Sequence, residues 1–164
     1  MGGYLAVAGV VLVAAITPGP NNFIVLAAAT RGLGWAVVKA ILAVMAGTML
    51  LLLLVWLGAG ELFQLLPMLK LALTFAGGGY LCWTGLRMAW RAGGEMGGTE
   101  TGPTGWGLAA FQLLNPKSWV LVLTAFAAAP DGEGALLFLL PIFLLITGSC
   151  LTLWALAGRA MARY

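Results

Sequence analysis

Charged residues are absent from four long stretches of this chain. These stretches run over residues 1–30, 40–60, 71–86 and 134–158 and consist mostly of apolar residues. An α-helix of about 20 residues rises about 30 Å, which is the thickness of the hydrocarbon core of a bilayer. Uninterrupted apolar runs of this length are typical of membrane-spanning helices. The pattern therefore predicts a polytopic membrane protein.

Gly, Pro and the few charged residues divide the apolar sequence into five spans. They run over Tyr4–Thr30, Ala40–Leu57, Leu66–Met88, Trp106–Ala128 and Ala135–Leu156. The connections are short except for residues 92–105, whose Gly-rich composition predicts a flexible cytoplasmic loop. We expect an all-α fold: a polytopic membrane helical bundle that forms a single transmembrane domain over residues 1–164.

The composition supports a membrane protein and excludes a soluble globular one. Hydrophobic residues make up 62% of the 164 residues and charged residues only 8%, whereas roughly 25% of the residues of a soluble domain are charged. The formal net charge of +3 does not indicate nucleic-acid binding, because Lys and Arg do not cluster. We expect the lipid bilayer, and no nucleic acid, as a partner.

The distribution of basic residues predicts the orientation. If the chain crosses the membrane five times, one side holds Arg31, Lys39, Arg87, Arg91, Arg159 and Arg163, and the other side holds Lys70. Cytoplasmic loops retain Lys and Arg. The amino terminus is therefore expected outside, and the end of the fifth span in the cytoplasm.

Two spans contain helix-breaking motifs near their middles, residues 17–22 in the first span and residues 114–117 in the fourth. Proline removes a backbone N–H and leaves the carbonyl four residues earlier without its partner. At membrane depth, such backbone is tolerated only inside protein or along a water-filled cavity. Each break then offers a helix N-terminus with partial positive charge and a helix C-terminus with bare carbonyls. We expect both breaks to line one substrate pocket.

Lys117 lies halfway along the fourth span, too deep for its side chain to reach either interface. A charge at the bilayer centre costs roughly 2.5 to 3.5 kcal/mol, so it usually has a function. Gln112 and Asn115 are three residues apart and share a helix face, which Lys117 joins only if the break at Pro116 re-aims it. The alternative is that the prolines are structural kinks and that Lys117 bonds a neighbouring carbonyl.

A zwitterionic amino acid fits this pattern of charge. Its carboxylate would lie near Lys117, the Asn115 amide and the N–H groups after Pro20, and its ammonium would face the carbonyls freed around Ala14, Ile16 and Gln112. The predicted substrate-binding residues are Thr17, Pro18, Gly19, Pro20, Asn21, Asn22, Tyr80, Gln112, Asn115, Pro116 and Lys117. For Tyr80, which follows three glycines in the third span, pocket and packing roles both stay open.

The first and fourth spans cross the membrane in opposite directions because they are three spans apart. This predicts an inverted repeat of three plus three spans, the architecture that surrounds a midplane site in secondary transporters. Residues 1–91 form the first repeat and residues 106–164 an incomplete second repeat, because a sixth span is expected.

Three stretches of the sequence resemble the lysine exporter (LysE/RhtB) family of bacterial amino-acid exporters. They are residues 17–21, residues 79–85 and residues 111–117, in order and at similar spacing. The resemblance implies a six-span inner-membrane protein that exports amino acids or their derivatives, driven by the proton gradient.

The sequence departs from the family at Thr48, which follows Gly47 where many members have Asp. The five spans hold no acidic residue, which favours a neutral over a cationic amino acid as substrate.

Other functions are weaker interpretations of the same sequence. A channel or a metal-ion exporter would need clustered carboxylate, His or thiolate ligands at depth, and the spans have no such cluster. An enzyme would need a nucleophile with a base, and His is absent. We therefore predict no metal, no cofactor and no enzymatic activity. An incomplete, non-transporting fragment and a homo-oligomer both remain open.

Reporter fusions test the orientation. A reporter fused after Tyr164 should be active in the cytoplasm, and a tag before Tyr4 should be accessible from outside intact cells, because the basic residues favour that arrangement. Accessibility on the opposite sides would refute the prediction.

Overall fold

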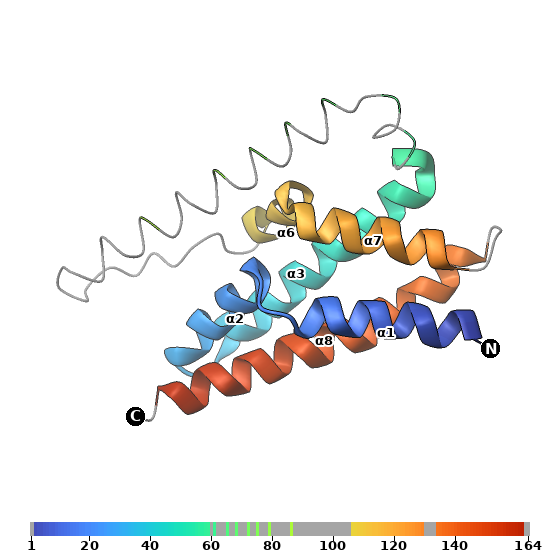
Figure 1. Cartoon of the computed structure of the whole chain (residues 1–164). Helices are drawn as coiled ribbons and strands as arrows, with labels where there is room; N and C mark the ends of the chain where they lie inside the picture. Colours follow the sequence, from blue (N-terminus) through green and yellow to red (C-terminus); the bar gives the residue numbers. More distant parts are fainter. Residues whose placement is uncertain are drawn as a thin grey trace.

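A computed structural model describes residues 2–59, 106–129 and 134–162, together with single residues at 61, 65, 68, 72, 75, 79 and 86. The elements in these ranges are α1 (Gly2–Ile16), α2 (Pro20–Thr30), α3 (Trp35–Leu54), η1 (Val55–Ala59), α6 (Trp106–Leu114), α7 (Pro116–Ala128) and α8 (Ala135–Met161). All of them are helical, which confirms the predicted all-α bundle (Figure 1). Tyr80, residues 92–105 and most of the predicted third span lie outside the described residues.

Several of these helices are long and apolar enough to cross a bilayer. Trp35–Gly58 has 24 residues and Ala135–Met161 has 27, while α1 and α2 pass the same test together as one span bent by 51°. Gly58 has a φ of 99°, in the left-handed region that favours glycine, and it lies where the second span was predicted to end. The protein is thus a polytopic helical membrane protein.

Both predicted breaks are present. In the first span, α1 ends at Ile16 and α2 begins at Pro20, with Gly19 in an extended conformation between them. In the fourth span, Asn115 separates α6 from α7, and Pro116 is the first residue of α7. Proline is favoured at the first helical position because its missing N–H would have no partner there in any case.

The helices extend beyond the hydrophobic stretches that predicted them. Helix α3 begins at Trp35 rather than Ala40, and α8 continues past Leu156 to Met161. These additions hold Lys39 and Arg159. Charged side chains at span ends can reach the membrane interface, so they do not interrupt a helix.

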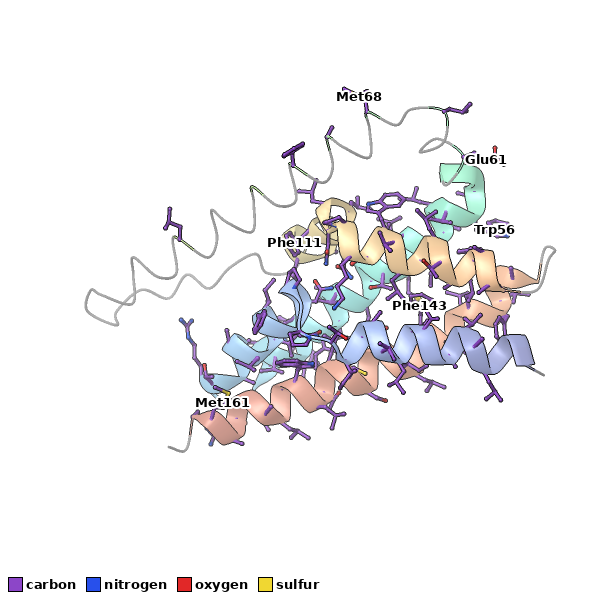
Figure 2. The ribbon with its side chains drawn as sticks, in the orientation of Figure 1. Trp56, Glu61, Met68, Phe111, Phe143 and Met161 are labelled. Carbon is purple, nitrogen blue, oxygen red and sulfur yellow. The ribbon has the colours of Figure 1, made fainter. Side chains whose placement is uncertain are left out.

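The apolar core consists of two clusters. The first is contributed by α2, α3, α6 and α8, and its buried members are Val25, Ala29, Val37, Ala40, Val44, Leu108, Phe111, Leu151 and Ala155. The second is contributed by α1, α3, α7 and α8, and its buried members are Val7, Val11, Leu51, Leu52, Val122, Ala125, Leu139 and Phe143. Phe111 of the first cluster and Phe143 of the second are labelled in Figure 2.

Each cluster combines one half of each broken span. Helix α2, the second half of the first span, shares the first cluster with α6, the first half of the fourth span. Helices α1 and α7 share the second cluster. This pairing requires the two broken spans to run in opposite directions, as Figure 1 shows for α1 and α7. The antiparallel arrangement is the one that an inverted repeat needs.

Helix α8 lies directly against α2 through a glycine. A Cβ placed on Gly158 would fall 3.0 Å from the carbonyl carbon of Leu26 and 3.1 Å from its Cα. Both atoms belong to the backbone, so they cannot move aside as a side chain would. The chain at Gly158 therefore has to lack a side chain.

Replacing this glycine should destabilise the bundle. We expect Gly158→Ala to lower the free energy of unfolding by about 1 to 3 kcal/mol through overpacking, measured as a lower unfolding temperature in mild detergent. The matched control is Gly148→Ala on the same helix, where a Cβ would meet only the end of the Met45 side chain at 3.4 Å. Equal unfolding temperatures for the two variants would contradict the close contact.

Candidate functional site

A cavity of about 50 Å³, lined by both polar and apolar side chains, lies where the two breaks meet, between the two apolar clusters. Its polar lining comprises Asn21 and Asn22 from the first break, Gln112, Asn115, Lys117 and Ser118 from the fourth span, Thr48 from α3 and Thr147 from α8. Gly19 and Pro20 also line it, whereas the predicted residues Thr17, Pro18 and Pro116 do not. The structure thus brings most of the described candidate residues to one place.

Gln112 connects four helices inside this cavity and is only 1% exposed. Its Oε1 accepts hydrogen bonds from Asn21 Nδ2 at 2.8 Å and from Ser118 Oγ at 3.0 Å. Its Nε2 donates to Thr48 Oγ1 at 2.7 Å and to the Val44 carbonyl at 3.4 Å. A buried amide without these partners would cost about 1 to 3 kcal/mol, so the network fixes how α2, α3, α6 and α7 meet.

Gly47 explains how Gln112 comes so close to α3. A Cβ at Gly47 would lie 2.5 Å from the Ala109 carbonyl oxygen and 2.6 Å from Gln112 Cγ. The neighbouring Thr48 hydroxyl donates to the Val44 carbonyl at 2.9 Å and accepts from Gln112. Thr48, the departure from the resembled family, is therefore part of the network.

Side chains satisfy the backbone carbonyls at the end of α1. Asn22, which is 5% exposed, donates from Nδ2 to the carbonyls of Ala15 at 3.0 Å and Thr17 at 2.9 Å. The indole Nε1 of Trp154 donates to the Ile16 carbonyl at 3.2 Å. Irregular backbone at membrane depth needs such partners.

Two of the carbonyls expected to face a substrate ammonium are therefore already engaged. Ile16 O accepts from Trp154, and Gln112 O accepts from the backbone N–H of Asn115 at 3.2 Å. Proline chemistry predicts which carbonyls lose a hydrogen bond within their own helix, but not the partners that other helices supply.

Lys117 joins the two broken spans. Its ammonium donates to the Thr17 carbonyl at 2.8 Å and lies 3.5 Å from the Pro18 carbonyl, at the C-terminal end of α1. That end has a partial negative charge, which stabilises a cation. Gly19 leaves room for this side chain, because a Cβ there would lie 3.0 Å from Nζ. The break at Pro116 thus re-aims Lys117 to the face shared by Gln112 and Asn115.

The two half-helices that begin at the cavity differ in their caps. Asn115 caps α7, since its side chain accepts from the Lys117 backbone N–H at 3.1 Å. Gly19 precedes α2 and provides no such hydrogen bond. The N-terminus of α2, which has no side-chain cap, lies next to the Lys117 ammonium, and this arrangement favours an anionic group.

Sequence reasoning missed Ser118, Thr147 and Trp154. Each is a polar or amphipathic residue in an apolar run, which is a weak signal. A Thr in a helix usually bonds the carbonyl four residues earlier, as Thr152 does with Gly148 at 2.8 Å. Only the tertiary structure shows which of these side chains face the cavity.

A model of the LysE type translocator family matches residues 12–163. This range includes both breaks and every described residue that lines the cavity. Neither the curated proteins nor the solved structures gave a match to the chain.

Removing the Asn22 amide should destabilise the first break. In Asn22→Leu the Ala15 carbonyl loses the hydrogen bond from Nδ2, and a buried unsatisfied carbonyl costs about 1 to 3 kcal/mol. We expect a lower unfolding temperature in detergent. Thr30→Val is the control, because it removes a hydrogen bond to Ala27 at an exposed site where solvent can replace it. An unchanged unfolding temperature for Asn22→Leu would contradict this role.

Proposed function

The protein belongs to the LysE type translocator family, whose model matches nearly its whole length, and we propose that it exports an amino acid or a derivative across the bacterial inner membrane. We expect its amino terminus outside and a proton-coupled, alternating-access mechanism. Membership of a translocator family and a multi-pass helical fold support transport.

The observation that carries the proposal is the position of Lys117. Its ammonium lies beside Gly19 and the uncapped N-terminus of α2, within a cavity between the breaks of two antiparallel spans. A substrate carboxylate placed there would accept charge-assisted hydrogen bonds from Lys117 and from the free N–H groups of α2. An amino acid has such a carboxylate whatever its side chain.

The charge of the cavity favours a substrate with a neutral side chain. Among the described lining residues, Lys117 has the one formal charge, and no carboxylate is present to offset it. Two like charges in a low-dielectric site repel strongly. A dicationic amino acid would therefore bind less well than a neutral one.

The two apolar clusters suggest how access alternates. Each cluster closes the bundle on one side of the cavity. At about 50 Å³, the cavity holds only a few water molecules, since each needs roughly 10 to 15 Å³ by this measure. We propose that one cluster separates at a time, which enlarges the cavity towards one membrane face. Lys117 is the described cavity-lining side chain able to exchange a proton.

Lys117→Met tests the site. Losing a charge-assisted hydrogen bond costs about 1.5 to 3 kcal/mol, so export should fall at least about tenfold. The protein should still insert, because removing a charge at membrane depth favours insertion. Efflux from cells loaded with a panel of dipeptides measures the effect.

The matched control is Lys39→Met, the same substitution at an exposed lysine that lies 5.9 Å from the Trp35 ring. It should leave export unchanged. If Lys117→Met exported every tested amino acid at the wild-type rate, the pocket would be refuted and both motifs would be structural kinks.

A further inference from the structure

Two residues that line the cavity each have a buried polar atom with no hydrogen-bond partner among the described residues. The two atoms are Asn21 Oδ1 and Thr147 Oγ1. A buried polar group without a partner is rare and usually has a structural or functional reason. We infer that these two atoms bind the ammonium group of the exported substrate, an assignment that rests on the proposed function.

The orientation of the Asn21 side-chain amide follows from the Val44 carbonyl, to which Gln112 links it. Val44 O can only accept, so Gln112 has to direct its Nε2 towards it. Gln112 Oε1 then faces Asn21, which directs its Nδ2 towards Gln112. Asn21 Oδ1 is left as an acceptor without a partner among the described residues, and the orientation of this amide is fixed.

Thr147 differs from Thr30, Thr48 and Thr152, whose hydroxyls donate to a backbone carbonyl three or four residues earlier in their helices. Thr147 Oγ1 has no hydrogen-bond partner among the described residues. It lies on α8, a helix that holds none of the predicted site residues.

The available atoms select a hydrogen-bond donor. Asn21 Oδ1 can only accept, whereas a hydroxyl accepts as well as donates. A primary ammonium has three N–H donors and can satisfy both atoms, but a carboxylate cannot satisfy Asn21 Oδ1. Lys117 already occupies the carbonyls of Thr17 and Pro18, so the substrate ammonium has to bind elsewhere in the cavity.

The two charged groups of the zwitterion then bind at two different positions. Its carboxylate lies at Lys117 and the N-terminus of α2, and its ammonium lies at Asn21 Oδ1 and Thr147 Oγ1. Both atoms are closed to solvent in this state, so a ligand reaches them only when the cavity enlarges. The ligand class is therefore a molecule with a carboxylate and a primary ammonium close together, which an α-amino acid provides.

The test compares two substrates in proteoliposomes that contain the full chain. One is the best-exported amino acid of the dipeptide panel, and the other is its des-amino carboxylic acid, which lacks the ammonium. In Thr147→Val, the substrate concentration for half-maximal efflux of the amino acid should rise about tenfold, the effect of one hydrogen bond to a charged group. Efflux of the des-amino acid should not change.

Two further variants make the test specific. Thr147→Ser keeps the hydroxyl and should restore most of the wild-type half-maximal concentration. Thr152→Val is the matched control, since it removes an exposed hydroxyl from the same helix that is already bonded to Gly148. It should behave as the wild type.

Each contrary outcome overturns a distinct statement. Wild-type efflux of the amino acid by Thr147→Val refutes the ammonium assignment but not the carboxylate position at Lys117. An equal loss for both substrates shows that Thr147 does not recognise the ammonium. If Lys117→Met has no effect, or the wild type exports no amino acid, the proposed function fails and the ammonium assignment fails with it.

Discussion

Backbone groups released at two helix breaks are the constraint on which the rest of this structure depends. In a bilayer these groups have no access to bulk water, so protein or cavity atoms have to satisfy them. Asn22, Trp154 and Lys117 bond the carbonyls at the end of α1, and Asn115 caps α7. Three of these four residues, Asn22, Asn115 and Lys117, also line the cavity. Satisfying the breaks and building the cavity are therefore largely the work of the same residues.

The helices that remain continuous allow the breaks to exist. Helices α3 and α8 contribute to both apolar clusters, whereas each half of a broken span contributes to one (Figure 1). Close approach at Gly47 and Gly158 brings α6 against α3 and α2 against α8. The two continuous helices thus keep four half-helices in place around a polar centre. Each cluster takes its buried residues from its own pair of half-helices, as the proposed alternation of access requires.

The orientation of the donors and acceptors that line the cavity cannot be read from the residue types alone. Gln112 donates to the Val44 carbonyl and accepts from Asn21 Nδ2. The Asn21 amide therefore has to turn its Oδ1 away from Gln112. Lys117 presents positive charge from the opposite break. The cation and the unpartnered acceptor belong to separate residues, which is the arrangement that the proposed binding of a zwitterion requires. A network of neutral amides and hydroxyls can provide this arrangement without any buried carboxylate.

The sequence by itself predicted a helical membrane bundle and its two helix breaks, which the structure confirms. These are properties of apolar run length and proline chemistry, which act within a few residues along the chain. It also named most of the polar residues that line the cavity, because polar groups at membrane depth are few. The tertiary structure alone decided that Lys117 bonds the broken first span, that Trp154 occupies the Ile16 carbonyl, and that Thr147 keeps a free hydroxyl. These outcomes depend on pairings between residues far apart in the chain, and local sequence does not specify which lone pair a distant helix will satisfy.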